Sequence, residues 1–294
     1  MNTTDLHFSS NKVRDIERCC LHLLDGLYPS DEARQLVWML FEAFLGWDVA
    51  QCLLHRDDTV NLSDLLKFHW AVEDLKRHRP IQYVLGCVPF CDCRIAVHEG
   101  VLIPRPETEE IVGKVVADFS ESLSNGRVLD CCTGSGCIAV ALAKQWSGAE
   151  VYGVDISPEA LRLARHNAAA NGVSVHFRMY DVLLHTGWDA PTFDLIVSNP
   201  PYVLDSQRAS MRRNVLDFEP HEALFVPDDD PLLFYRAIAA FALCHLAPRG
   251  TLVFEINETL ASETSALLQS LGFDTSLSLD FRGRQRCLVA RRNL

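Results

Sequence analysis

Four consecutive residues at the end of an apolar run could hold an uncharged NH₂ group in a fixed orientation. Residues 193–197 predict a buried strand, and Asn199, Pro200, Pro201 and Tyr202 follow it closely. The two prolines fix two φ angles and remove two backbone donors, which leaves a stiff segment with free carbonyls. The side-chain oxygen of Asn199 and the carbonyl of Pro200 can each accept one N–H bond. The nitrogen lone pair would then face an electrophile while Tyr202 excludes water. A plain turn is the alternative interpretation, because Asn-Pro is common in turns.

A glycine-containing loop after another predicted strand could receive a cofactor. Residues 130–137 read Asp-Cys-Cys-Thr-Gly-Ser-Gly-Cys and precede a predicted helix. Gly134 and Gly136 allow a tight turn that brings N–H groups to a ligand, and the helix N-terminus favours a negative group. A dinucleotide fingerprint needs a third glycine where this sequence has Ala139, so a nicotinamide cofactor remains an alternative. We expect the strand before Asn199 to lie beside the strand before this loop, which brings both to one edge of the sheet.

Two acidic residues after the following strands could contact a nucleoside. Asp155 ends a predicted strand, where a carboxylate can accept hydrogen bonds from both hydroxyls of a ribose. Capping of the next helix is its alternative role, but Ser157 is better placed for that. Asp181 could meet an adenine edge, with Val182 beneath the ring, or it could cap its own loop. No Lys or Arg adjoins the glycines to bind a phosphate. S-adenosylmethionine, with a carboxylate, a ribose and an adenine but no phosphate, fits this set.

Composition and charge exclude several classes of protein. The chain has 294 residues, 48% of them hydrophobic, and a formal net charge of −12. Neither the segment up to Leu85 nor the rest of the chain has a net positive charge, which disfavours nucleic acid as a substrate. No apolar run approaches the roughly 18 residues that span a bilayer, and the first residues lack the apolar centre of a signal peptide. We therefore expect a cytoplasmic protein with no membrane contact.

The cysteines favour reduced thiols over disulfides or a metal site. There are eleven, an odd number, and they include two adjacent pairs within a predicted helix and a predicted strand. Cys87, Cys91 and Cys93 are the one cluster whose spacing could suit a metal, but no matching pair follows at the spacing of a zinc site. We expect no metal.

The elements that must position these residues form three predicted domains. Residues 1–79 have apolar residues at helical spacing and predict a small all-α bundle, in which Pro29-Ser30 caps a helix that ends near Gly46. Residues 80–106, broken by Gly and Pro, predict a β-hairpin connector rather than helices. Residues 107–294 alternate strand with helix and predict an α/β domain, whose open parallel sheet has helices on both faces. The expected strands are 128–130, 150–155, 175–178, 193–198, 250–256 and two more at the end, and the expected helices are 138–145, 158–171, 231–246 and 259–271.

These motifs together resemble a known family, the release-factor glutamine methyltransferases (PrmC/HemK). That family is part of the wider group of methyltransferases that act on planar NH₂ nitrogens and carry the motif Asn/Asp-Pro-Pro-Tyr/Phe. The resemblance covers nearly the full length. Four further stretches carry it: residues 79–86 (Arg-Pro-Ile-Gln-Tyr-Val-Leu-Gly), 102–109 (Leu-Ile-Pro-Arg-Pro-Glu-Thr-Glu), 218–224 and 280–286. It implies a Rossmann-like class I methyltransferase domain with a mostly parallel seven-stranded sheet.

The resemblance also implies a reaction, a partner and a set of site residues. The reaction would be methyl transfer from S-adenosylmethionine to the side-chain amide nitrogen (N5) of the glutamine in the Gly-Gly-Gln motif of class I peptide chain release factors, leaving S-adenosylhomocysteine. The N-terminal helices would help dock the release factor. Arg105, Glu107 and Thr108 would shape the wall near the acceptor, and Arg105 would contact the substrate. The implied cofactor contacts are Cys132, Thr133, Gly134, Ser135, Gly136, Asp155, Asp181, Val182 and Asn199, and the implied acceptor pocket consists of Asn199, Pro200, Pro201 and Tyr202.

Three other functions stay open. The first is methylation of a glutamine of a large-subunit ribosomal protein. Cys132 stands where the release-factor family usually has Gly, and its loop is also similar to that of a sibling family with this ribosomal activity. An adenine N6-methyltransferase of DNA or RNA would present the same NH₂ geometry, although the net charge opposes it. The third is a scaffold that binds the cofactor without catalysis. Val182 and Asn257 also depart from the family pattern, which commonly has a larger residue and Gly there.

Overall fold

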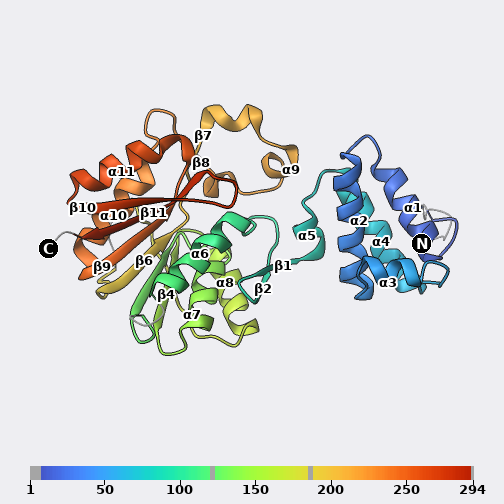
Figure 1. Ribbon diagram of the computed structural model, residues 1–294, viewed down its shortest axis with the longest axis horizontal. Helices are drawn as coiled ribbons and strands as arrows, with labels where there is room; N and C mark the ends of the chain where they lie inside the picture. The colour runs from blue at the N-terminus through green and yellow to red at the C-terminus, as the bar shows by residue number, and fades with distance from the viewer. Residues whose placement is uncertain (1–7, 120–122, 185–187, 293–294) are drawn as a thin grey trace. The chain divides into compact units, whose positions relative to one another are not determined.

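The computed structural model describes residues 8–119, 123–184 and 188–292. The chain divides into two compact units (Figure 1): residues 1–86 together with 213–218, and residues 87–212 together with 219–294. No helix within the described ranges is both long enough and apolar enough to span a bilayer. The domain boundaries predicted at residues 79 and 106 stay a prediction.

The first unit is helical, as predicted. Its core is formed by apolar side chains that recur on one face of each long helix, such as Ile16, Val37, Leu40, Phe68 and Val72, all fully buried. The helices are α1 (Val13–Leu24), α2 (Ser30–Leu45), α3 (Val49–Leu54), α4 (Leu62–Lys76) and α5 (Ile81–Leu85), together with α9 (Arg213–Leu216).

Of the predicted cap Pro29-Ser30, Pro29 occupies the N-cap position without a side-chain hydrogen bond, while Ser30 is already the first residue of α2. One local prediction in this region was wrong. Residues 81–85 form helix α5 instead of belonging to a helix-free connector. Pro80 occupies the N-cap position with φ −53° and ψ 134°, just before the helical turn, and Gly86, in the left-handed conformation with φ 74°, ends the helix. Ile81 anchors the short helix in the core of the first unit.

The rest of the predicted connector contains the expected hairpin. Strands β1 (Cys87–Phe90) and β2 (Cys93–Ala96) pair antiparallel. Cys91 and Asp92 connect them with positive φ angles of 44° and 60°, which match the twist of a two-residue hairpin turn. The hairpin belongs to the second unit, where the side-chain amide of Asn167 accepts from the amide of Ala96 at 2.8 Å and donates to its carbonyl at 3.0 Å.

A seven-stranded sheet forms the centre of the second unit and confirms the predicted fold class. Its strand order is β10-β11-β9-β6-β3-β4-β5, and β11 is antiparallel to both of its neighbours while the other pairs are parallel. The strands are β3 (Arg127–Cys131), β4 (Glu150–Asp155), β5 (His176–Met179), β6 (Phe193–Ser198), β9 (Leu246–Glu255), β10 (Phe273–Leu279) and β11 (Gln285–Arg292).

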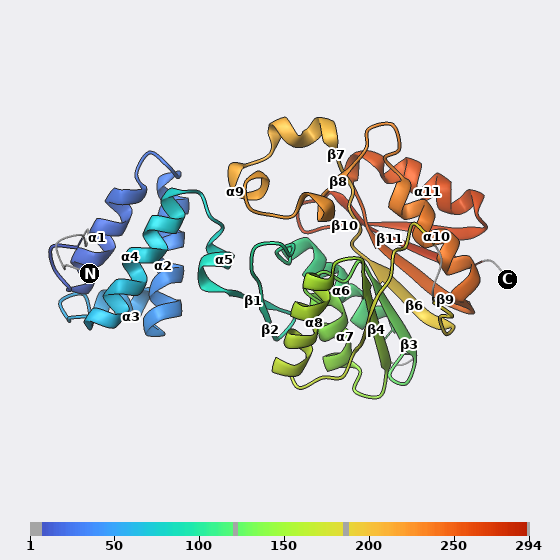
Figure 2. The same cartoon turned by 180° about the vertical axis from the view of Figure 1, so that it is seen from behind.

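Helices cover both faces of this sheet, as Figures 1 and 2 show. One face carries α6 (Pro106–Phe119), α7 (Cys137–Gln145) and α8 (Pro158–Ala170), and the other carries α10 (Leu233–His245) and α11 (Ala261–Ser270). The central strands are buried on both sides, which explains why they read as continuous apolar runs. The sequence did not predict helices α6 and α9. It also did not predict the short elements β7 (Val203–Leu204), β8 (Phe225–Val226), η2 (Asp205–Ser210), η3 (His221–Ala223) and η4 (Glu258–Leu260).

Candidate active site

The carboxyl ends of three neighbouring strands meet at one edge of the sheet, as the sequence predicted. Cys131 at the end of β3 lies beside Val154 of β4 and beside Ser198 of β6. The loops that follow these strands therefore converge, which is where open α/β sheets bind ligands. A pocket of about 280 Å³ opens at this edge.

Seven of the predicted site residues line this pocket. The other six lie around it: Thr133, Ser135, Gly136 and Pro200 are buried, and Arg105 and Tyr202 are partly buried. Apolar walls of the pocket come from residues that the sequence did not single out, including Val101, Ile156, Tyr180 and Phe234. The predicted residues in the lining are Cys132, Gly134, Asp155, Asp181, Val182, Asn199 and Pro201.

Alternating left-handed residues shape the glycine loop. Cys132, Gly134 and Gly136 have φ angles of 59°, 54° and 79°. At Gly136 a Cβ atom would lie 2.9 Å from the Cβ of Ala164, so this glycine lets α7 start close against α8. At Gly134 a Cβ atom would meet open space, and the backbone can approach a ligand there. Cys132, with φ 59°, adopts a left-handed conformation that favours glycine.

Backbone amides fix the carboxylate of Asp155 in the pocket wall. Its Oδ2 accepts from the amide of Gly134 at 2.8 Å, and its Oδ1 accepts from the amide of Ser157 at 2.9 Å. Burial raises the pKa of this carboxyl, while the backbone hydrogen bonds oppose the rise. Ser157 itself caps α8, accepting from the amide of Ala160 at 3.2 Å, as predicted. Each oxygen of Asp155 keeps a further lone pair for a ligand hydroxyl.

Asp181 caps its own loop and also lines the pocket. Its Oδ1 accepts from the amide of Leu183 at 2.8 Å, so it caps its own loop. The same residue and its neighbour Val182 also line the pocket, beside Tyr180.

A chain of side-chain hydrogen bonds holds the Asn199 corner. The Nδ2 of Asn199 donates to Oγ1 of Thr108 at 3.1 Å, and that hydroxyl donates to Oε2 of Glu255 at 2.5 Å. The hydroxyl of Tyr202 donates to the other oxygen of Glu255 at 2.8 Å. Glu255 ends β9 and is 2% exposed. Burial raises its pKa, and the hydrogen bonds from Thr108 and Tyr202 oppose this.

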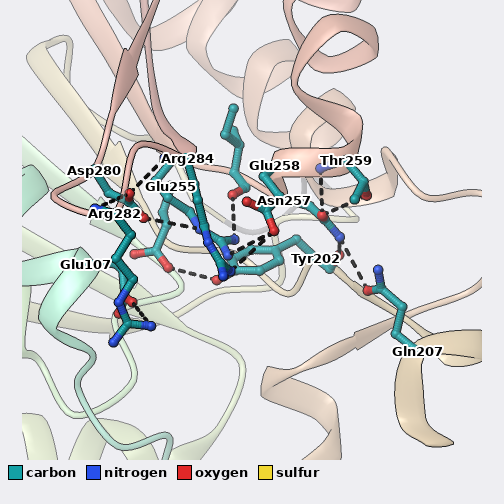
Figure 3. Close-up of polar contacts among 12 residues, drawn as sticks. Glu107, Tyr202, Gln207, Glu255, Asn257, Glu258, Thr259, Asp280, Arg282 and Arg284 are labelled. Atoms are coloured by element: carbon teal, nitrogen blue, oxygen red, sulfur yellow. Dashed lines mark hydrogen bonds and ion pairs between the residues drawn. The ribbon is translucent and has the colours of Figure 1, made fainter. Parts of the chain in front are cut away.

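Tyr202 is held at both its side chain and its backbone. Figure 3 shows the hydroxyl on Glu255 and the carbonyl facing Asn257, whose Nδ2 donates to it at 3.0 Å. The Oδ1 of Asn257 in turn accepts from the amide of Thr259 at 3.1 Å. The side chain of Asn257 thus links the carbonyl of Tyr202 to the amide of Thr259, and a glycine at this position could make neither bond.

Arg105 and Glu107 are engaged within the protein. Arg105 donates from Nη2 to Oε1 of Glu219 at 2.6 Å, and the amide of Ile103 donates to Oε2 at 3.1 Å. The Glu219 side chain is only 1% exposed, so this pair binds the segment before α6 to the segment before η3. Glu107 lies 3.7 Å from a guanidinium nitrogen of Arg282.

Asp130, just before the glycine loop, is a buried acid with incomplete hydrogen bonding. Its Oδ2 accepts from the hydroxyl of Thr133 at 2.5 Å and from the amide of Ala139 at 3.1 Å. Its Oδ1 is buried without a hydrogen-bond partner among the described residues. Burial raises the pKa of this carboxyl to about 7.

The raised pKa of Asp130 predicts a pH-dependent loss of stability. Between about pH 4 and 7 the folded protein holds this proton, whereas the unfolded chain has released it, so stability falls as pH rises through this range and levels off above the folded pKa of about 7. A folded pKa of about 7 removes about 1.4 kcal/mol of unfolding free energy between about pH 6 and 8. Urea unfolding at both pH values should show this fall in wild type and in Asp194→Asn, whose carboxylate is exposed, but not in Asp130→Asn. An equal fall in all three proteins would contradict the assignment.

Glu255 was not predicted as a site residue. Its type and place carried a usable signal, because it ends β9, and β9 lies next to the strand that leads to Asn199. Thr108 was expected only to help shape the wall near the acceptor, and its hydrogen bonds to Asn199 and Glu255 were not predicted.

Among residues 8–119, 123–184 and 188–292, thiols and acids form no cluster suited to a metal. All eleven cysteines have free thiols. In the part of the chain that the structure describes, no three or more His, Cys, Asp or Glu side chains are grouped so as to hold a metal ion.

The chain is similar to known proteins in two separate regions and, for some relatives, along most of its length. Two family models match, "Methyltransferase small domain" over residues 114–217 and "PrmC N-terminal domain" over residues 21–86. The chain is 39% identical over 268 residues to a release factor glutamine methyltransferase of Flavobacterium psychrophilum, covering 90% of this chain and 94% of that protein. It is also 39% identical over 270 residues to one of Bacteroides thetaiotaomicron, covering 92% and 96%. A solved release factor-specific protein-(glutamine-N5) methyltransferase of Alicyclobacillus acidocaldarius is 28% identical, with a TM-score of 0.41, over 65% of this chain and 95% of that one.

Proposed function

Because this chain belongs to the release factor glutamine methyltransferase family, we propose that it methylates the side-chain amide nitrogen of the glutamine in the Gly-Gly-Gln motif of a class I peptide chain release factor. The methyl donor in this proposal is S-adenosylmethionine, which supplies an electrophilic methyl group when bound and leaves as S-adenosylhomocysteine. The proposal places the enzyme in the cytoplasm together with its acceptor.

The pocket fits this donor in shape and charge. It has room for a nucleoside, with carboxylates of Asp155 and Asp181 among apolar walls. Its lining in the described residues contains no Lys or Arg, so it suits a ribose and an adenine better than a phosphate. Asp155 would accept from the ribose hydroxyls, and Asp181 with Val182 would receive the adenine. Cys132 to Gly136 would surround the amino acid end.

The Asn199 corner is the observation that carries the proposal. Asn199 lies at the pocket lining with its Nδ2 already bonded to Thr108, which leaves its Oδ1 to accept an N–H of the acceptor amide. The carbonyl of Pro200 would accept the second N–H. Two fixed acceptors hold both N–H bonds of the carboxamide, so that the nitrogen lone pair, which is perpendicular to the amide plane, points at the methyl group, and they stabilise the positive charge that grows on nitrogen. The nitrogen becomes acidic as it is methylated, so no strong base is needed.

Tyr202 and the remaining predicted residues would act around this corner. Tyr202, held by Glu255, would close the corner against water, and Pro201 lies in the pocket wall. Arg105 would act indirectly, because its guanidinium is bonded to Glu219. Residues 1–79 would dock the release factor.

Peptide mass mapping of a release factor after incubation with the protein and S-adenosylmethionine tests the proposal. We expect one added methyl group on the peptide that contains Gly-Gly-Gln, and none when that glutamine is replaced by alanine. A large-subunit ribosomal protein in a parallel reaction tests the sibling activity. Methylation of the ribosomal protein alone would overturn the choice of acceptor, and methylation of neither would overturn the proposal.

Adenine in DNA or RNA remains the main alternative acceptor, because its exocyclic NH₂ is also planar. The net charge of −12 and an isoelectric point of about 5.3 oppose strong binding to phosphates. Methyl transfer to an adenine-containing oligonucleotide that weakens steeply with salt would favour this alternative.

A further inference from the structure

Thr108 occupies a position in the hydrogen-bond chain that constrains which way the Asn199 amide faces. It is 2% exposed and lies in the first turn of α6, far along the sequence from both of its partners. Its Oγ1 contacts Nδ2 of Asn199 at 3.1 Å and Oε2 of Glu255 at 2.5 Å. One hydroxyl therefore sits between an amide at the pocket and a buried carboxyl.

The chemistry of a hydroxyl sets the direction of these bonds. A threonine hydroxyl has a single proton to donate, and its oxygen can accept further bonds. A carboxylate can only accept, so the proton of Thr108 goes to Glu255. The hydroxyl of Tyr202 donates to the other carboxylate oxygen at 2.8 Å, and this occupies the second side of Glu255. Toward Asn199 the oxygen of Thr108 can then only accept, and it selects the NH₂ end of the amide.

We infer that Thr108 and Glu255 are positioning residues that fix the flip of the Asn199 amide, so that its oxygen rather than its NH₂ group is presented to the acceptor. This inference deepens the proposed function and rests on it. An amide turned the other way would present a donor to the donor NH₂ group of the substrate glutamine. Such an arrangement loses one of the two bonds that orient the acceptor and leaves two like dipoles opposed.

Replacing Thr108 by valine tests the inference, because valine has nearly the same shape without the hydroxyl. We expect Thr108→Val to lower kcat for methylation of the release factor by about 10-fold or more, while the Kd for S-adenosylmethionine stays within about twofold. Thr108→Ser keeps a hydroxyl and should restore most of the turnover. Thr264→Val is a matched control, because Thr264 is also buried and its hydroxyl donates to the carbonyl of Leu260 at 2.7 Å in α11.

A double substitution separates positioning from general damage to the fold. If Thr108 acts through Asn199, Thr108→Val should cause no further loss in an Asn199→Ala background, within about twofold. The same fractional loss in both backgrounds would overturn the inference, and so would wild-type turnover in Thr108→Val. Wild-type protein that fails to methylate the release factor would instead overturn the proposed function.

A readout without any methyl acceptor tests the same amide directly. In ¹⁵N-labelled protein with S-adenosylmethionine, the NH₂ signals of Asn199 are assigned by their loss in Asn199→Ala. These protons should exchange slowly with water in wild type and Thr108→Ser, and faster in Thr108→Val. Equal exchange in all three proteins would overturn the inference whatever the acceptor is.

Discussion

Replacing Asn199 with alanine is expected to lower kcat for methyl transfer by about 10²- to 10³-fold, the loss typical when one fixed hydrogen-bonding group is removed from a developing charge. The substitution removes the oxygen that would hold one N–H of the acceptor, and it frees Thr108 from its bond to Nδ2. The carbonyl of Pro200 alone cannot fix the plane of the carboxamide. Single-turnover rates with saturating cofactor and release factor measure this effect on the chemical step.

Asn199→Gln is the matched control for this prediction. It keeps the carboxamide but moves it by one methylene. If the position of the amide oxygen matters, kcat should fall strongly in this variant too. If any nearby carboxamide were sufficient, kcat should recover. Calorimetric titration should show S-adenosylmethionine binding largely retained in both variants. Turnover within about threefold of wild type in Asn199→Ala would remove the argument from orientation.

Asp155→Ala is expected to raise the Kd for S-adenosylmethionine by about 100-fold or more, because hydrogen bonds to a charged group contribute about 1.5–3 kcal/mol each. Two losses combine in this variant. The ribose hydroxyls lose their acceptor, and the amides of Gly134 and Ser157 lose the carboxylate that fixes the loop and the start of α8. Isothermal titration calorimetry of the purified proteins measures the change.

Asp194→Ala provides a matched control for Asp155→Ala. Asp194 also accepts a backbone N–H bond, from Arg127 at 2.8 Å, but it lies near the start of β6, at the opposite edge of the sheet. We expect its removal to leave the Kd unchanged within about twofold. A similar loss of affinity in the two variants would show that Asp155 acts through stability, and an unchanged Kd in Asp155→Ala would show that the ribose binds elsewhere.

The sheet and its cofactor edge were predictable because their signals are local. Each central strand is a short apolar run, and the run before Asn199 ends at the residues that the structure brings to the pocket. The capping role of Ser157 and the loop role of Asp181 follow from residues only two or three positions away. The parallel pairing of β3 with β6 followed from the alternation of strand and helix.

The support of the Asn199 corner was not predictable, because its partners are distant in the chain. Thr108 lies 91 residues from Asn199 and 147 residues from Glu255. No periodicity links residues at such separations, and only the folded sheet brings them together. Helix α5 was missed for a different reason. Its single turn is too short to show helical periodicity, and Pro80 and Gly86 resembled loop signals until their φ angles were known.

The antiparallel insertion of β11 between β9 and β10 makes the Asn199 corner depend on a hairpin that contributes no residue to the pocket lining. Strand β9 carries Glu255 at its end, and in the described residues it pairs with β6 on one side and with β11 on the other. Deleting residues 273–292 would leave β9 as an open edge with unpaired N–H and C=O groups. Such a truncated protein is expected to misplace Glu255 and to associate through the exposed strand, so the hairpin also protects the enzyme against aggregation.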